Sequence, residues 1–271
     1  MIAKKRQLLT VAACLLVPIG AQANDIEPGS EFYTAFKTAT PIVIDGDLSE
    51  WSSANAVENP RFSIPKGSGD GGELVSFESL GGDWTGPEDH SSSLQVAYDD
   101  DNVYIGLVVT DEYHENAANS AWNGDSVQMM IANGDRDGQV ALYNYALGGV
   151  EGALGDIIVD HEAGPGGTDG VVTRNSETHL TTYEVAMPKA SLALDELTSG
   201  VLFGLGMAIN DGDELTPGQQ GWSGLGAHAL VFGKSPSETA LITLEVPEPS
   251  SIGLLLIAMC AMLRRRRKGP R

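Results

Sequence analysis

The chain has 271 residues with 37 acidic and 16 basic side chains, a formal net charge of −21, and only two cysteines. All acidic residues except Glu248 lie in the segment 24–246, together with only seven basic ones, so charge repulsion excludes nucleic acid and anionic lipid as partners and leaves calcium or a neutral sugar compatible. Cys14 and Cys260 lie near the chain ends, so no disulfide crosslinks this segment, whose length suits one large sandwich core.

The N-terminus has the three parts of a secretory signal peptide. Lys4-Lys5-Arg6 is basic, Leu8 to Ile19 is apolar, and Ala21-Gln22-Ala23 is a small-residue cleavage site. We therefore expect residues 1–23 to be removed and the protein to be exported. A lipoprotein cleavage box at Val11-Ala12-Ala13-Cys14 is the alternative, but too few uncharged residues precede it to form an apolar region.

Short runs rich in β-branched and aromatic residues, separated by Asp, Asn and Gly, follow a polar lead-in at 24–40. The only expected helical turn is Pro188 to Leu197. Taken with the absence of other helical patterns, the runs predict an all-β, antiparallel β-sandwich over residues 24–246. The expected strands are 41–44, 74–77, 94–98, 103–109, 126–131, 140–147, 156–159, 171–174, 180–186, 201–210, 230–233 and 240–246.

Two of the tryptophans have predicted structural roles. Asp45-Gly46-Asp47 strongly favours a turn. An apolar residue precedes this turn and Trp51 follows it, so we expect the chain to fold back and bury Trp51 in the core. Residues 65–93 are rich in Gly, Ser and acids and are expected to form a long surface loop. Asp83-Trp84 in this loop is a lesser candidate for ligand contact, and we expect Trp84 mainly to pin the loop.

The order of several short motifs resembles the family 9 carbohydrate-binding modules and their DOMON-like relatives over about residues 41–246. The resemblance implies their β-sandwich fold. The motifs are Asp45-Gly46-Asp47 with Trp51, the strand Val103-Tyr104-Ile105-Gly106 that ends at Asp111, the run from Trp122 to Gln128, and Asn210-Asp211 before Trp222.

This resemblance implies a sugar site. In sugar-binding members two tryptophans sandwich a terminal sugar, which here would be Trp122 and Trp222, with Gln128 and Asn123 beside the first and Gln219 beside the second. A pyranose presents apolar faces that stack on indole and hydroxyls that need planar amide partners. The family usually has a glutamate at the position of Gln128. The glutamine in this chain is therefore expected to alter the recognition of sugar hydroxyls. The alternative is that both tryptophans are structural.

The acidic turns are candidates for calcium, which prefers several carboxylate and carbonyl oxygens. The family resemblance places such a site near Asp111 or in the turn that holds Asp99 and Asp101. Solvated turn acids are the alternative. The acids in or beside turns are Asp99, Asp101, Asp111, Asp135, Asp137, Asp211 and Asp213, and none has the spacing of an EF-hand loop.

No motif in the chain predicts a catalytic residue or a bound haem. His114-Glu115 and His161-Glu162 begin like a zinc-protease motif but lack the second histidine. A pair of carboxylates that cleaves glycosides stays open as an alternative. A related branch of the family binds haem through methionine and histidine, but methionines in strands are usually core residues, so we expect no haem. The residues concerned are Met129, Met130, Met207 and His228.

The C-terminus consists of Pro247-Glu248-Pro249, an apolar run at 252–263 and the basic cluster 264–268. The run is shorter than the roughly 20 residues of a spanning helix and alone would be a weak anchor. This order resembles the PEP-CTERM sorting signal, which implies export, transient anchoring in the inner membrane and cleavage by an exosortase-type protease.

Together these features predict an exported, non-catalytic protein that binds carbohydrate or extracellular polysaccharide at the cell surface or in the matrix. One alternative is a calcium-stabilised structural matrix protein with no sugar site. The other is an accessory domain with glycoside hydrolase activity.

Overall fold

The computed structural model describes residues 32–51, 56–58, 62–63, 74–75, 77–82, 84–226, 228–231 and 233–247. Several predicted features lie outside these ranges, namely the signal peptide, the apolar run 252–263, the basic cluster 264–268, Asp83, Glu248 and Pro249. No helix within them has the length and apolar character to cross a membrane.

The described residues are mostly strands. The only α-helix among them is α1 (His228–Val231), and the 3-10 turns are η1 (Ser49–Trp51), η2 (Lys189–Leu192) and η3 (Pro236–Glu238). The strands are β1 (Phe32–Lys37), β2 (Ala56–Glu58), β3 (Phe62–Ser63), β4 (Leu74–Val75), β5 (Glu78–Ser79), β6 (His90–Tyr98), β7 (Asn102–Asp111), β8 (Glu115–Asn116), β9 (Ser126–Ala132), β10 (Gln139–Val150), β11 (Ala153–Ala163), β12 (Asp169–Asn175), β13 (Leu180–Pro188), β14 (Leu202–Asp213), β15 (Thr216–Leu225) and β16 (Ala240–Glu245).

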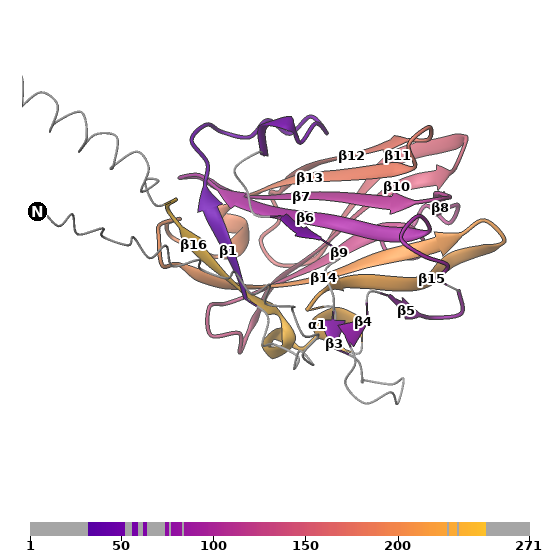
Figure 1. Cartoon of the computed structure of the whole chain (residues 1–271). Coiled ribbons are helices and arrows are strands. Elements are labelled where there is room, and N and C mark those ends of the chain that lie inside the picture. Colours follow the sequence, from indigo (N-terminus) through magenta and orange to yellow (C-terminus); the bar gives the residue numbers. More distant parts are fainter. Residues whose placement is uncertain are drawn as a thin grey trace, which may run out of the picture.

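All of these strands except β3 and β4, which pair only with each other, form one strongly curled sheet that folds over itself into two layers (Figure 1). One layer contains β6, β7, β13 and β12, and the other contains β11, β10, β9, β14 and β15. Strands β16 and β1 connect the layers, and β1 runs parallel to both of its neighbours, β16 and β6. The other pairings are antiparallel, so the predicted antiparallel sandwich is confirmed, with β1 as its parallel exception.

The core lies between the two layers because every second residue of each strand points inward. The inward rows include Leu94 and Ile105 from one layer and Met129 and Met207 from the other. Both methionines are therefore core residues, as expected for strands. A smaller apolar cluster covers the outer face of the second layer, where α1 packs on Met130.

Three predicted elements differ from the structure. Residues 32–37 of the expected polar lead-in form strand β1, because Tyr33 and Ala35 alternate inward and their backbone completes the sheet between β16 and β6. The expected strand 41–44 is irregular, since its Ile42 packs against Trp51 rather than entering a sheet. The expected strand 230–233 begins within helix α1, because Leu230 packs down on the outer face of the sheet.

Trp51 is a core residue, as predicted, and Glu184 of β13 explains its position. The indole is 2% exposed and donates from Nε1 to Glu184 Oε1 at 2.9 Å. The second oxygen, Glu184 Oε2, accepts the backbone N–H groups of Asp45 and Gly46 at 2.9 and 2.8 Å. One buried carboxylate therefore holds both the Asp45-Gly46 turn and the tryptophan that follows it.

Candidate functional site

The loop between β8 and β9 presents Trp122 to solvent. The indole is 48% exposed, whereas the buried side chain of Asn116 fixes the loop beneath it. Asn116 Oδ1 accepts the N–H of Ser120 at 2.8 Å, and its Nδ2 donates to the carbonyl of Asp125 at 3.1 Å. Gly124 has φ +127°, and a Cβ there would lie 2.5 Å from a backbone oxygen, so this tight loop requires glycine.

A network of side-chain amides lies next to the Trp122 loop. Asn210 of β14 donates to the Trp122 carbonyl at 3.2 Å and accepts from Gln219 Nε2 at 2.6 Å. Asn123 Oδ1 accepts the backbone N–H of Gln219 at 3.0 Å. Among the described residues this leaves Asn123 Nδ2 and Gln219 Oε1 without a partner, one as a donor and the other as an acceptor. The predicted residues Trp122, Asn123 and Gln219 are thus brought together.

Gln128 lies on the same outer face of the second layer, two residues along β9 from Ser126, which pairs with Asn210. Its neighbour across the strand is Asn144 of β10. Asn144 is fully buried, donates to Glu162 at 2.7 Å, and has an Oδ1 with no partner. This outer face therefore carries a row of amides that continues from the Trp122 loop toward β11.

Trp222 differs from the expectation of a two-sided stack. It lies opposite Asn210 in the β14–β15 pair, next to the amide network, but its side chain is only 3% exposed. A ring must offer a free face to stack on a sugar. The structure therefore gives a one-sided aromatic surface at Trp122, whereas Trp222 is buried in β15.

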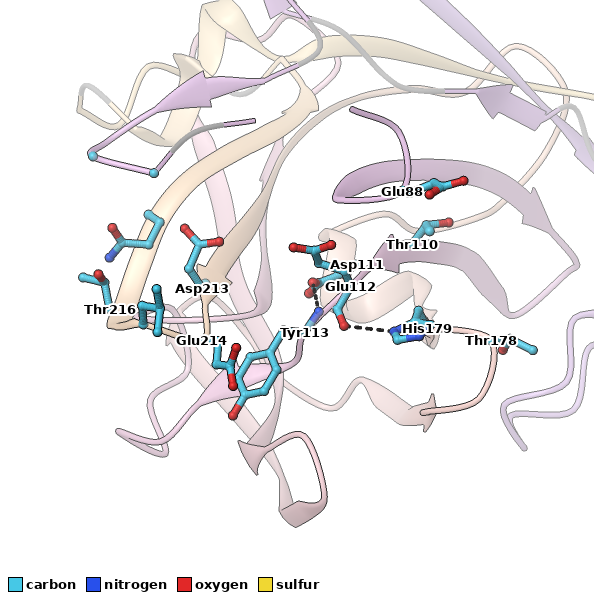
Figure 2. A pocket seen from close by; sticks show the side chains of 15 residues that line it. Glu88, Thr110, Asp111, Glu112, Tyr113, Thr178, His179, Asp213, Glu214 and Thr216 are labelled. Atoms are coloured by element: carbon cyan, nitrogen blue, oxygen red, sulfur yellow. Dashed lines mark hydrogen bonds between the residues drawn. The ribbon is translucent and has the colours of Figure 1, made fainter. Parts of the chain in front are cut away.

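A cleft of about 840 Å³ opens at the same end of the sandwich (Figure 2). It is lined by the end of β7 and the residues after it, by the turn before β13, and by the hairpin between β14 and β15. Asp111, the last residue of β7, is one of its lining residues.

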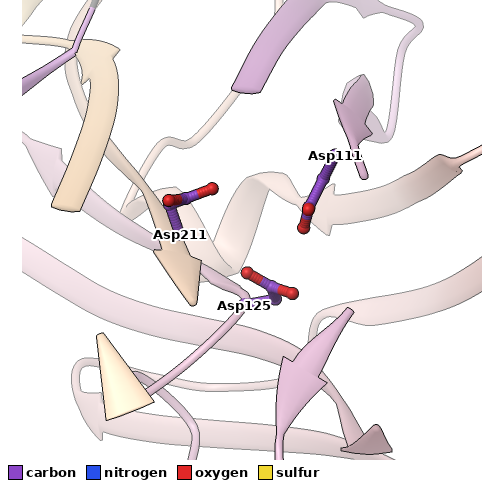
Figure 3. Close-up of side chains that lie close together, drawn as sticks. All are labelled: Asp111, Asp125 and Asp211. Carbon is purple, nitrogen blue, oxygen red and sulfur yellow. The ribbon is translucent and has the colours of Figure 1, made fainter. Parts of the chain in front are cut away.

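Beneath this cleft, three aspartates converge from different parts of the fold (Figure 3). Asp111 ends β7, Asp125 precedes β9 and Asp211 lies in β14, and all three are buried with carboxylate oxygens within 4.8 Å of one another. Burial raises the pKa of Asp111 well above its usual range, and the charges of Asp125 and Asp211 raise it further. Burial and the charge of Asp211 likewise raise the pKa of Asp125. We call these three residues the aspartate trio.

Hydrogen bonds hold the trio in place. Asp125 Oδ1 accepts the N–H of Gly212 at 2.7 Å, and Oδ2 accepts that of Glu115 at 2.6 Å. Asp211 Oδ1 lies 3.0 Å from His90 Nδ1, while His90 Nε2 contacts Ser223. Asp125 thus connects the Trp122 loop to β8 and β14, so the trio and the loop share their support.

His114 adds an unpaired lone pair to the trio. Its Nε2 lies 2.8 Å from the carbonyl of Leu147 and must carry the ring proton, because a carbonyl can only accept. In the neutral ring Nδ1 is then an acceptor, and it lies 3.3 Å from Asp125 Oδ2 with no hydrogen-bond partner. Burial lowers the pKa of His114, which disfavours a charged ring that would resolve this contact. The nearby positive group is Arg174, whose Nη2 donates to the backbone carbonyl of Asp111 at 2.8 Å and to Glu151.

The trio fits a calcium ion. Oxygen ligands at about 2.3–2.6 Å from calcium lie at most about 5 Å apart, which agrees with the observed spacing of three carboxylates. Of the residues expected near calcium, Asp111 belongs to this cluster, but Asp99 and Asp101 lie at the opposite end of β7. Asp99 is there saturated by donors, namely the N–H groups of Asp101 and Asn102 and the hydroxyl of Tyr104.

Asp125 and Asn144 were not predicted from the sequence to belong to a site. Asp125 stands inside the quoted motif from Trp122 to Gln128, directly before an apolar strand, which is a signal for a buried acid at a strand end. Asn144 offered no signal because only the pairing of β9 with β10 shows that it neighbours Gln128.

Among the residues that the structure describes, the remaining candidates from the sequence do not form a catalytic arrangement. His161 contacts Thr168 at 2.9 Å, and the exposed Glu162 is bound to Asn144. Trp84 is 42% exposed and donates from Nε1 to the carbonyl of His90 at 2.9 Å, so it ties its loop to β6.

Comparisons with known proteins agree with this architecture. A family model described as carbohydrate family 9 binding domain-like matches residues 73–230. Two solved structures of a carbohydrate binding module family 9 from Caldicellulosiruptor kristjanssonii, in complex with cellotriose and with glucose, are similar to this chain at 13% identity and a TM-score of 0.56. They cover 80% of this chain and 96% and 98% of their own. A search of curated proteins finds no match.

Proposed function

This chain belongs to the carbohydrate family 9 binding domain-like family, and we propose that it is an exported, non-catalytic protein that binds carbohydrate at Trp122. The observation that carries the proposal is the half-exposed indole of Trp122 beside side-chain amides that keep an unused donor and acceptor. An apolar ring face and planar hydrogen-bonding groups are the two features that a pyranose needs from a binding site.

The shape of this surface supports a terminal or short saccharide. The similar family 9 modules were solved in complex with cellotriose and glucose, so glucose-containing oligosaccharides are the first ligands to test. Gln128 supplies a neutral amide on the same face, which recognises hydroxyls as donor and acceptor rather than as acceptor alone. With one exposed aromatic ring, stacking contributes about 0.5–1.5 kcal/mol beyond burial, and binding in the micromolar to millimolar range follows.

The test is a calorimetric titration of the protein with cellotriose and a panel of neutral oligosaccharides. Trp122→Ala should weaken binding about tenfold or more, because both the stack and its buried area are lost. Trp84→Ala is the matched control, since it removes another exposed indole on a different loop. Unchanged binding by Trp122→Ala, or equal loss in both variants, would overturn the proposal.

Export and sorting are the second part of the proposal. The signal-peptide pattern at 1–23 and the Pro247-Glu248-Pro249 tail support release to the cell surface or matrix after transient membrane anchoring and exosortase-type cleavage. Mass spectrometry of the cell-surface protein should find an N-terminus near Asn24 and a C-terminus near Pro247. A surface protein that retains the basic cluster 264–268 would contradict this processing.

A calcium-stabilised structural protein is the second candidate function, and the aspartate trio is the observation that favours it. Three buried carboxylates, of which Asp111 and Asp125 have raised pKa values, lie beside an imidazole lone pair and need a cation or protons. Bound calcium would hold the residues that support the Trp122 loop, so this role is compatible with sugar binding. If calcium stabilises the protein strongly and no saccharide binds, the structural function replaces the carbohydrate-binding one.

A further inference from the structure

The amides on the outer face of the second layer continue into acidic side chains of β11. Asn144 of β10 pairs with Gln128 of β9 on one side and with Asp160 of β11 on the other. It points outward, because the next residue, Tyr143, belongs to the core. The register between β10 and β11 shifts beside Glu162, whose Oε1 accepts from Asn144 Nδ2 at 2.7 Å. We call Gln128, Asn144, Asp160 and Glu162 the β11 row.

Asn144 has an acceptor that the rest of the protein does not use. The carboxylate of Glu162 accepts hydrogen bonds, so the Asn144 atom that faces it is the donor Nδ2, which leaves Oδ1 on the other side of the amide. Asn144 is fully buried, and its Oδ1 has no hydrogen-bond partner among the described residues. A buried oxygen without a donor is unfavourable. A ligand group that donates a hydrogen bond between Gln128 and Glu162 would satisfy it.

The other members of the row are also free to bind. The half-buried amide of Gln128 has no hydrogen bond within the part of the chain that the structure describes. Asp160 and Glu162 are exposed, and no described basic side chain pairs with either of them. The described basic groups that form contacts do so elsewhere, namely Lys37 with Asp100, Lys189 with Asp101, Arg174 with Glu151, and Arg136 with the carbonyl of Thr239.

The β11 row therefore has more acceptors than donors. Its acceptors are the orphaned Asn144 Oδ1, two carboxylates and the Gln128 carbonyl, whereas its only free donor is the Gln128 amide group. A sugar hydroxyl brings one donor together with acceptor lone pairs, but a protonated amine brings three donors and a positive charge. Hydrogen bonds in which both groups are charged are also the stronger ones. The row is thus more complementary to an ammonium group than to a hydroxyl.

We propose that the β11 row makes the Trp122 surface selective for saccharides with free, protonated amino groups. This inference rests on the proposed function, because Trp122 supplies the ring on which the sugar stacks. The ammonium group pairs with Asp160 and Glu162 and donates toward Asn144, while the Gln128 amide binds a neighbouring hydroxyl. Two strand spacings, about 10 Å, separate β9 from β11, so a chain of two or three sugars is needed to reach both Trp122 and the acids.

The test compares two trisaccharides of the same shape by calorimetric titration at low salt. Cellotriose has a hydroxyl on each ring where glucosamine trisaccharide, at a pH that protonates its amines, has an ammonium group. N-acetylglucosamine trisaccharide is the third probe, because its nitrogens are neutral amides. The variant of the row is Asp160→Asn/Glu162→Gln, which removes both charges and keeps the shapes. The control, Glu112→Gln/Glu214→Gln, changes the net charge equally at exposed positions in the cleft.

In the wild type, glucosamine trisaccharide should bind about fivefold more tightly than cellotriose, and the N-acetylated trisaccharide should not. The row variant should reduce this preference below about twofold and leave cellotriose affinity within about twofold, while the control keeps the preference. Trp122→Ala should weaken both ligands. Added salt should reduce the preference, because it screens exposed charges.

Three results would overturn the inference and leave the proposed function in place, provided that cellotriose binding depends on Trp122. They are equal affinities of the wild type for cellotriose and glucosamine trisaccharide, an equal loss of preference in the row variant and the control, and amine binding that Trp122→Ala does not weaken. The last result would place the amine at another acidic surface. If none of the three trisaccharides binds, both the inference and the proposed function are wrong.

Discussion

The two ends of strand β7 carry aspartates in opposite environments. Asp99, in the turn before β7, is partly buried, but hydrogen bonds from Asp101, Tyr104 and Asn102 more than offset that burial and lower its pKa. Asp111, the last residue of β7, is buried next to two other carboxylates, and its pKa is raised. At one end of β7 an aspartate therefore stabilises a turn by accepting hydrogen bonds from that turn. At the other end an aspartate is buried close to two like charges, which is electrostatically unfavourable.

The two environments distinguish an acidic side chain that stabilises the fold by itself from acidic side chains that need a bound ligand. The Asp99 turn supplies its own donors and requires nothing from solution. The aspartate trio places three carboxylates together in the interior, and natural proteins keep such costs mainly where a ligand offsets them.

Asp125→Ala should destabilise the protein by about 3 kcal/mol, because the buried N–H groups of Glu115 and Gly212 lose their acceptor. Asp101→Ala, at the other end of β7, should change the free energy of unfolding by less than about 0.5 kcal/mol, since its side chain is exposed. Urea unfolding measures both. Similar losses of unfolding free energy in the two variants would show that the aspartates at the two ends of β7 do not differ in this way.

Calcium should stabilise the protein through the trio. A concentration of 100 times the dissociation constant adds about 2.7 kcal/mol to the free energy of unfolding. Asp111→Asn should lose most of this gain, while Asp99→Asn should keep it, because Asp99 lies outside the trio. Thermal unfolding with calcium and with EDTA is the measurement. Loss of the gain in Asp99→Asn alone would relocate the site to the turn.

Without bound cations, the stability contributed by the trio should fall as the pH rises. Carboxyl groups with a folded-state pKa above the unfolded value take up protons on folding, so their contribution is largest below both values and declines as the pH rises through the raised pKa. In EDTA, the wild type should lose stability as the pH rises above the ordinary range of carboxyl pKa values, and Asp111→Asn should lose less. An equal slope in the variant would show that the remaining surface acids cause the effect.

Trp122→Ala should have the smallest effect on stability, within about 0.5 kcal/mol, because the indole is half-exposed on a loop fixed by Asn116. Trp51→Ala is the contrast: it removes a buried ring and should cost about 3–5 kcal/mol. Chemical unfolding of both variants checks this. A large loss in Trp122→Ala would make that tryptophan structural.

Most of the longer strands and the buried Trp51 were predictable because alternation and turn residues are local signals, but β15 was not expected. The position of β1 was not, since it lies between β6 and β16, and β16 comes more than 200 positions later in the chain. Trp122 was correctly placed at a strand entrance, but the burial of Trp222 depends on packing that no local pattern reveals. The aspartate trio escaped prediction for the same reason, because its members come from three separate segments.

The central claim is that the exposed Trp122, and not a core tryptophan, contacts sugar. NMR detection of the indole N–H signals during a titration with cellotriose and related neutral oligosaccharides tests this most directly. We predict a concentration-dependent shift of the Trp122 signal that saturates in the micromolar to millimolar range, while the buried Trp51, bonded to Glu184, stays unchanged. A Trp122 signal that remains unmoved by every sugar in the panel would contradict the account.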